Sequence, residues 1–279
     1  VLTKLPDGER QRLDEVYDGA TQTYMPVIKR LGRNAFSNLI YHTRGVYSST
    51  TDVPVNPATG KRLQYGSANS GIYFQAGDPI WTDINGDYVI DDQDKVTIGN
   101  PIPRFVGGLN STIEYKNFIL TVFASYTLGR DVLNGALAES FRNYYTPATA
   151  SALVPIDGYD YWRPSENSKD VGTANAQYPN PFDYLRASTL NTYRTDQSLF
   201  LEDGSYWKIN QVTLTYNIDR KYTSRLRITS SSVYFTANNV YTFSNYKGPD
   251  PELVSQLGRD YSNGYPNRRS YTIGVNVQF

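Results

Sequence analysis

The stretch Tyr271-Thr-Ile-Gly-Val-Asn-Val-Gln-Phe279 decides the fold class of this chain. Its residues alternate strictly between apolar and polar, as in an extended strand that has one apolar face and one polar face. The apolar face carries Tyr271, Ile273, Val275, Val277 and Phe279, and the polar face carries Thr272, Gly274, Asn276 and Gln278. In a soluble β-sandwich the apolar face would point into the core, whereas in an outer-membrane barrel it would point outward into lipid. The stretch alone predicts a strand and leaves both architectures open.

Composition favours the barrel. The chain has 279 residues, of which 39% are hydrophobic and 14% aromatic, and its 25 Tyr outnumber its 11 Phe and 3 Trp. Tyr is an amphipathic ring that suits membrane interfaces and polar lumens. Mean hydropathy is −0.52, and no apolar run approaches the ~18 residues of a spanning helix. A barrel is compatible with these values because only alternate residues of its strands face lipid.

Several functional classes are excluded or disfavoured by the same counts. Lys+Arg and Asp+Glu are equal at 27 each, so nothing indicates a nucleic-acid partner. The absence of Cys excludes disulfides, thiolate metal sites and cysteine nucleophiles. No Gly-rich phosphate loop or nucleophile elbow is present. We therefore expect a protein that is not an enzyme.

Short and long connections alternate along the second part of the chain. Strands are predicted at 104–116 and 118–129, separated by only two residues, which is the length of a tight hairpin. Further strands are predicted at about 204–218 and 226–242, joined by a short polar turn and followed by the terminal strand. Long loops are predicted at about 130–200 and 243–267, with a short helix at 131–143 in the first of them. Short turns at one rim and long loops at the other are typical of outer-membrane barrels, and place the carboxyl terminus on the periplasmic side.

The pattern divides the chain into two regions. Residues 1–103 are expected to hold barrel strands and an extracellular loop, with a possible short helix at 9–17 and a strand-like stretch near 36–48. Residues 104–279 are expected to hold the C-terminal barrel strands and the two long loops. The predicted fold class is all-β.

One motif carries specific inorganic chemistry. The stretch Asp83-Ile-Asn-Gly-Asp-Tyr-Val-Ile-Asp-Asp-Gln-Asp94 has the spacing of a calcium-binding loop of the EF-hand or dockerin type, in which oxygen ligands surround a hard cation. Position 6 of such a loop is normally Gly and position 12 normally Glu, whereas this chain has Tyr88 and Asp94 there. The alternative is an Asp/Asn-rich turn without metal. The predicted cofactor is a structural Ca²⁺ ion, and its predicted ligands are Asp83, Asn85, Asp87, the Val89 carbonyl, Asp91 and Asp94.

Three neighbouring aromatic residues are the only candidates for contacts with a substrate. Tyr159, Tyr161 and Trp162 could offer stacking faces to a sugar, or they could pack the long loop onto the rest of the protein. No arrangement of carboxylates or His indicates a catalytic site.

A series of motifs in fixed order resembles one known family. The motifs are Asp83-Ile-Asn-Gly-Asp87, Ile90-Asp-Asp-Gln-Asp94, Ile98-Gly-Asn-Pro-Ile-Pro-Arg-Phe105, Tyr115-Lys-Asn-Phe118, Asp160-Tyr-Trp-Arg-Pro164, Phe200-Leu-Glu-Asp-Gly-Ser-Tyr-Trp-Lys-Ile209, Asn238-Asn-Val-Tyr-Thr-Phe243, Tyr246-Lys-Gly-Pro-Asp-Pro-Glu252, Tyr265-Pro266 and the terminal strand. Over residues 80–279 the chain resembles the carboxy-terminal part of the SusC/RagA family of TonB-dependent outer-membrane transporters from Bacteroidota. Residues 1–75 match this family poorly.

The resemblance implies more than the spacing does. Members of this family are antiparallel transmembrane barrels of about 22 strands with long extracellular loops, closed by a plug, and they work with a SusD-like surface lipoprotein as a lid. The implied function is active, TonB-dependent import of an oligosaccharide or a peptide across the bacterial outer membrane. The plug domain and the TonB box are absent from these 279 residues, and about six strands cannot close a barrel of that size. We therefore expect the chain to be part of a larger transporter.

Two other functions remain open at this point. A passive porin-like barrel would use the same strands without TonB, and a soluble β-sandwich could bind glycans.

Overall fold

A computed structural model describes residues 3–5, 11–18, 23–34, 36–145, 153, 155–223, 228–261 and 265–279. The chain folds as two compact units, each built from separate stretches of sequence. Unit 1 comprises residues 1–101, 132–202 and 255–263, and unit 2 comprises residues 102–131, 203–254 and 264–279. No helix among the described residues is long and apolar enough to cross a membrane.

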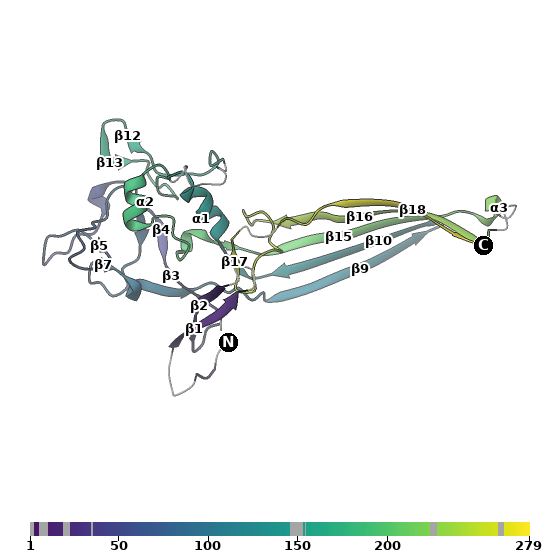
Figure 1. The fold of residues 1–279 in the computed structure, drawn as a ribbon, viewed down its shortest axis with the longest axis horizontal. Helices are drawn as coiled ribbons and strands as arrows, with labels where there is room; N and C mark the ends of the chain where they lie inside the picture. Colours follow the sequence, from purple (N-terminus) through teal and green to yellow (C-terminus); the bar gives the residue numbers. More distant parts are fainter. Residues whose placement is uncertain are drawn as a thin grey trace. The chain divides into compact units, whose positions relative to one another are not determined.

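Unit 2 is one antiparallel sheet of five long strands (Figure 1). Its strands, in both chain order and spatial order, are β9 (Phe105–Tyr115), β10 (Phe118–Leu128), β15 (Tyr206–Asn217), β16 (Ser230–Ser244) and β18 (Ser270–Gln278). A one-turn helix, α3 (Arg220–Thr223), lies in the connection from β15 to β16. The strands predicted at 104–116, 118–129 and 204–218 are confirmed to within two residues at each end. The predicted strand at 226–242 begins at Ser230 and continues to Ser244; its first two residues lie outside the described residues.

Unit 1 consists of short strands and helices around aromatic cores. Its two-stranded pairs are β1 (Gln11–Asp18) with β2 (Thr23–Arg30), β3 (Asn38–Tyr41) with β8 (Lys95–Ile98), β4 (Thr43–Val46) with β6 (Pro79–Trp81), β5 (Gln64–Tyr65) with β7 (Val89–Ile90), and β12 (Pro164–Ser165) with β13 (Ser168–Gly172). A three-stranded sheet has the order β14 (Leu201–Asp203), β11 (Asp131–Asn134), β17 (Arg259–Asp260), and the helices are α1 (Gly135–Arg142) and α2 (Tyr184–Leu190). The described residues of 1–103 therefore form short pairs and add no strand to the five-stranded sheet.

Two local predictions need correction. The stretch 11–17 is a strand and not a helix, because it pairs along its whole length with β2; residues 9 and 10 lie outside the described part of the chain. The helix predicted at 131–143 begins only at Gly135, because residues 131–134 form β11. The helix cap is Asn134, whose side chain accepts a hydrogen bond from the Leu137 amide at 2.9 Å.

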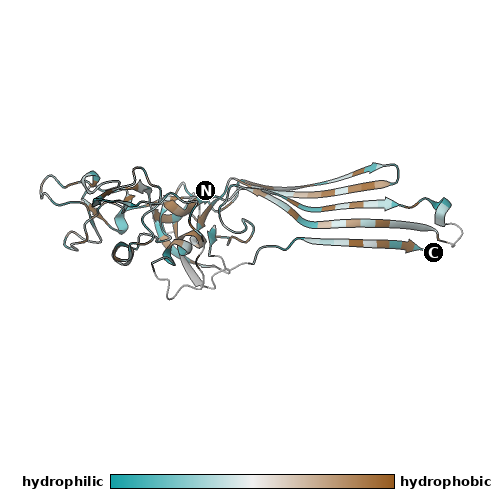
Figure 2. Ribbon diagram, turned by 90° about the horizontal axis from the view of Figure 1, so that it is seen from above, coloured by the Kyte–Doolittle hydropathy of each residue, from teal (hydrophilic) through white to brown (hydrophobic). Residues whose placement is uncertain are grey.

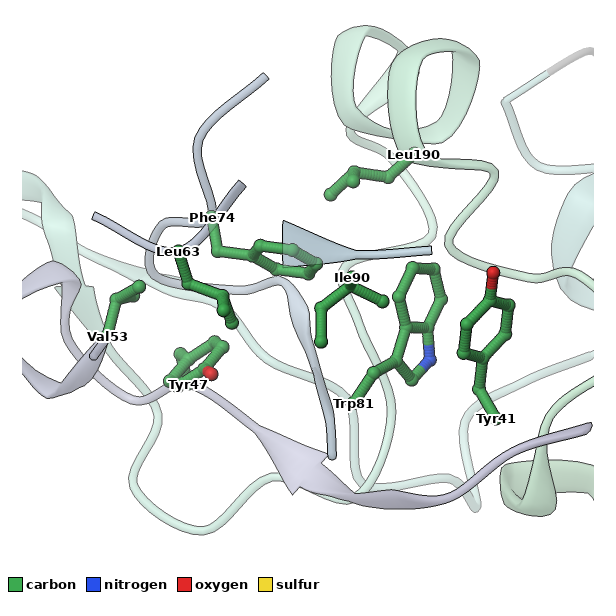
Figure 3. Packing of buried hydrophobic residues seen from close by; sticks show 8 residues of the cluster. All are labelled: Tyr41, Tyr47, Val53, Leu63, Phe74, Trp81, Ile90 and Leu190. Atoms are coloured by element: carbon green, nitrogen blue, oxygen red, sulfur yellow. The ribbon is translucent and has the colours of Figure 1, made fainter. Parts of the chain in front are cut away.

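The core of unit 1 joins segments that lie far apart in sequence (Figure 3). Trp81 stacks on Tyr41 with ring centroids 5.0 Å apart and meets the edge of Phe74 at 5.9 Å. Leu190 of α2 lies in the same buried cluster. The Trp81 indole donates to the buried side chain of Gln197 at 2.9 Å, so the ring nitrogen is satisfied inside the core. The described residues of 132–202, between β10 and β15, are thus a folded part of unit 1.

Candidate membrane-spanning wall and acidic loop

The five-stranded sheet has one continuous apolar face, because cross-strand partners carry side chains on the same side. Along one register row, Leu120 pairs with Ile113 and with Leu214, and Leu214 pairs in turn with Phe235. Phe235 pairs with Ile273 of β18, so the row crosses all five strands. Figure 2 shows the same alternation as hydrophobic and hydrophilic segments along each strand. Large apolar side chains stay open to solvent on this face, among them Leu109 (65%), Ile113 (59%) and Ile273 (76%).

Aromatic rings lie towards both ends of this face. Towards one end, Phe118 and Tyr216 are cross-strand partners with ring centroids 4.9 Å apart. Towards the other, Tyr126 and Trp207 are partners at 4.7 Å. The eight residue steps from Phe118 to Tyr126 span about 26 Å along the strand at roughly 3.3 Å per residue. A tilt of about 40° reduces this to ~20 Å of depth, close to the ~25 Å apolar band of outer-membrane barrels, which is bounded by aromatic girdles.

The opposite face is polar and carries a row of threonines, one from each strand. In strand order they are Thr112, Thr121, Thr213, Thr236 and Thr272, and each is the register partner of the next. Hydroxyl groups in the row contact one another, at 3.4 Å between Thr112 and Thr121 and at 3.0 Å between Thr213 and Thr236. Such a surface is compatible with water and polar groups and is costly to place in lipid.

The motif Asn238-Asn-Val-Tyr-Thr-Phe243 contains a β-bulge. The register between β15 and β16 shifts around Asn210 and Asn239, and Asn239 has a left-handed backbone with φ of 53°. Its side chain donates to the Arg268 carbonyl at 2.8 Å, which ties the bulge to the entry of β18. Beyond the bulge, Tyr241 pairs with Ile209 and Phe243 with Trp207, so both rings return to the apolar face.

Both short connections of unit 2 lie at the same end of the sheet. The turn after Tyr115 needs only two residues, and Lys116 adopts a left-handed φ of 54°. The Asn117 side chain donates to the Asn217 carbonyl at 2.9 Å and to the Asp219 carboxylate at 2.7 Å, which joins the two turns. Gln278, at the end of β18, pairs with Ser230 at this same end.

The acidic loop wraps around its own backbone. The Asp83 carboxylate accepts hydrogen bonds from the Gly86 amide at 2.7 Å and the Tyr88 amide at 2.9 Å. The Asp94 carboxylate accepts the Ile84 amide at 2.7 Å and the Asp91 amide at 2.9 Å. Tyr88 has a φ of 63°, so it adopts the left-handed conformation that Gly normally supplies at position 6.

Calcium requires several oxygen ligands that converge on one point. Burial raises the pKa of the Asp94 carboxyl, against the amides of Asp91 and Ile84, which lower it. Within the described part of the chain, no three acidic or His side chains converge on one point as a metal site requires. The backbone path fits a calcium loop, but several carboxylate oxygens are engaged with backbone amides. Calcium binding by the six predicted ligands stays a prediction.

The three aromatic candidates lie in packed surroundings. Trp162 is 4% exposed and packs with Val46 and Ala176. A side chain at Gly172 would meet the Trp162 ring at 2.5 Å, so the indole fits against bare backbone. Tyr159 lies edge-on to Phe141 at 5.2 Å, and Tyr161 lies 5.9 Å from Phe182. A role for the three rings in binding a substrate stays a prediction.

Sequence patterns did not reveal a buried ion pair in unit 1. Asp78 is fully buried, and its carboxylate accepts two hydrogen bonds from the Arg186 guanidinium, at 2.9 and 2.5 Å. The Gln75 amide adds a third at 2.8 Å. Burial raises the pKa of Asp78 to about 6, although Arg186 and the amide oppose this shift. Because the partners are 108 residues apart, no local pattern signals the pair.

The wall and the loops define a class of protein: an antiparallel barrel segment of the outer-membrane type with long, folded connections. Comparisons with known proteins agree with this class. No family model matches the chain. It is 26% identical over 288 aligned residues to the TonB-dependent receptor P3 of Formosa agariphila, an alignment that covers 100% of this chain and 25% of that protein. It is 27% identical to the TonB-dependent receptor SusC of Bacteroides thetaiotaomicron, over 75% of this chain and 18% of that protein.

Solved structures show the same fold. The RagAB peptide importer in its open-open state superposes with a TM-score of 0.63 at 18% identity, covering 99% of this chain and 25% of that one. The closed-closed state gives a TM-score of 0.59. The predicted resemblance is thus confirmed: the chain is similar over its whole length to the receptor P3 and over 75% of its length to SusC, and it has the fold of the carboxy-terminal part of a SusC/RagA-type barrel. It spans about a quarter of the length of the first relative (25%) and of the RagAB chain (25%).

Proposed function

We propose that this chain supplies part of the wall and the extracellular loops of a TonB-dependent importer in a bacterial outer membrane. The observation that carries the proposal is the five-stranded sheet, with its exposed apolar face between two aromatic bands and its threonine row on the opposite face. The curated relatives are TonB-dependent receptors, which supports active import over catalysis. The nutrient is an oligosaccharide or a peptide.

The proposal includes an orientation and partners. The two short turns and the end of β18 lie at the periplasmic side, and the long loops at about 130–200 and 243–267 lie at the cell surface. Turn lengths support this orientation, because outer-membrane barrels have short periplasmic turns and long extracellular loops. A SusD-like lipoprotein covers the loops as a lid, a partnership supported by the similarity to SusC and RagAB. The plug and the TonB contact lie in parts of the transporter outside these 279 residues.

The soluble β-sandwich is disfavoured by the sheet itself. A sandwich would bury its apolar face against a second sheet. In unit 2 the apolar face instead leaves side chains such as Leu109 and Ile273 more than half exposed, and the described residues of the unit form a single sheet.

Labelling of intact cells tests the orientation. The chain has no Cys, so a single cysteine can be introduced at Ser168 or at Asn117 of the full-length protein. A membrane-impermeant maleimide should label the Ser168 variant in intact cells and the Asn117 variant only after lysis. Labelling of Asn117 alone in intact cells would invert the proposed orientation.

Energy dependence tests active import against a passive pore. Cells that carry the full-length protein should accumulate labelled oligosaccharides or peptides, and a protonophore or deletion of TonB should abolish this uptake. Passage that continues at the same rate after either treatment would favour the porin-like alternative.

A further inference from the structure

Basic side chains gather at the turn end of the sheet, beside the aromatic residues of the apolar face. Lys116 follows Tyr115, and its ammonium group lies 5.3 Å from the centroid of that ring. Lys221 lies 4.8 Å from the ring of Tyr222 in α3. Both distances are within the range of a cation–π contact, which holds a long side chain over an aromatic face. Arg220, also exposed, is the neighbour of Lys221 in the same turn.

These groups lie close together because the two turns are hydrogen-bonded. The Asn117 side chain bridges from one turn to Asn217 and Asp219 of the other. Asp219 also pairs with Lys221 at 3.2 Å, so this acidic group is already engaged. For the side chains of Lys116 and Arg220, the described residues show no acidic partner. Counted with the nearby Glu114, the described side chains of the turn end comprise three basic and two acidic groups, so an excess of one positive charge remains.

The rings fix the level of this charge relative to the apolar face. Tyr115 is 68% exposed and Tyr222 66%, and Tyr115 shares a register row with Phe118 and Tyr216. Tyr and Trp prefer the headgroup level of a bilayer, and Lys and Arg extend from an apolar stem towards the polar boundary. The cations therefore lie where the phosphate groups of phospholipids would be.

We propose that Lys116 and Arg220, assisted by Lys221, bind the phosphate groups of phospholipid headgroups in the membrane leaflet that surrounds the turn end. Charge complementarity selects this occupant: the surface is basic, it borders the lipid-facing rings, and phosphate accepts charge-assisted hydrogen bonds from both side chains. The contact would anchor the sheet at a fixed depth and favour anionic lipids. The proposal depends on the membrane placement above and goes beyond it.

The test uses the full-length transporter in nanodiscs made of phosphatidylcholine alone or of an equal mixture with phosphatidylglycerol. Native mass spectrometry of the released protein measures how much of each lipid is retained. The wild-type protein should retain phosphatidylglycerol preferentially. In the variant Lys116→Gln/Arg220→Gln, the affinity for phosphatidylglycerol relative to phosphatidylcholine should fall about thirtyfold, because each cation near an anionic surface contributes roughly fivefold.

A matched variant controls for net charge. Lys61→Gln/Lys169→Gln removes two exposed cations from unit 1 and should leave lipid retention unchanged. Equal retention by all three proteins, or equal loss in both variants, would overturn the phosphate site. A protein that does not enter nanodiscs at all would instead contradict the proposed membrane placement, so the two failures are distinguishable.

Discussion

An arginine at Val275 should destabilise the protein far more than an arginine at Asn276. Val275 lies on the apolar face, paired with Val233, whereas Asn276 lies on the polar face, paired with Ser232. Val275 is four residues from Tyr271 and four from Phe279, or about 13 Å from each at roughly 3.3 Å per residue. It is thus the midpoint of the apolar side of its strand, where the cost of a charge in lipid is highest.

The expected cost of Val275→Arg is about 2–4 kcal/mol, the value for Arg or Lys at the midplane of a barrel's lipid face. This corresponds to a ratio of folded to unfolded protein lower by roughly thirtyfold to nearly a thousandfold at a fixed denaturant concentration. Asn276→Arg adds the same charge to a face that contacts water and should cost well under 1 kcal/mol. Urea titration of the full-length protein in lipid vesicles, followed by the gel shift of the folded barrel, measures both variants. Equal midpoints would refute the assignment of one face to lipid and the other to a polar lumen.

Two further predictions concern the loops. Arg186→Met should lower the free energy of unfolding of unit 1 by about 3–5 kcal/mol, because it leaves the buried Asp78 carboxylate unpaired. Limited proteolysis of the full-length protein measures this loss, and the double variant Asp78→Asn/Arg186→Met should recover most of it. Burial raises the folded pKa of Asp78 to about 6, above an unfolded value near 4, so this carboxyl's contribution to stability is lost as the pH rises through that window. The loss of stability caused by Arg186→Met should therefore be smaller at about pH 5 than at about pH 8. A loss that does not depend on pH would contradict the buried charge. For the acidic loop, calorimetry on chelator-treated protein should detect the binding of one Ca²⁺ ion. Asp83→Asn should abolish this binding, and the matched exposed change Asp92→Asn should leave it in place. The absence of any heat of binding, or an equal loss in both variants, would refute the calcium prediction.

The long strands could be predicted because each one shows its environment in its own sequence. A strand with one face towards lipid and one towards water alternates between apolar and polar residues, and β18 does so over its whole length. In β10 every second residue from Phe118 to Leu128 is apolar, and Ile119 and Phe123 are the apolar exceptions on the other face. The start of β16 was predicted too early, because Leu226 and Ile228 alternate with Arg227 and Thr229 as in a strand, although β16 begins only at Ser230. The 11–17 stretch was misassigned for a related reason: only its pairing with β2 makes it a strand.

The folding of the long loops could not be predicted from local patterns. Tyr41, Trp81 and Leu190 meet in one core although up to 149 residues separate them. Arg186 and Asp78 likewise depend on a contact between distant segments. In the acidic loop, the spacing predicted the wrap, but not that Tyr88 adopts the left-handed backbone while its ring packs against the core cluster.

Depth-dependent quenching at two adjacent residues of β18 tests the central claim most directly. A fluorophore attached to Ile273→Cys or Thr272→Cys of the full-length protein reports the surroundings of opposite faces of the same strand. With the protein in vesicles that contain brominated lipid, the label at Ile273 should be quenched strongly, and the label at Thr272 should be quenched only by a water-soluble quencher. Equal quenching by brominated lipid at both positions, or stronger quenching at Thr272, would contradict a membrane-spanning wall with its apolar face in lipid.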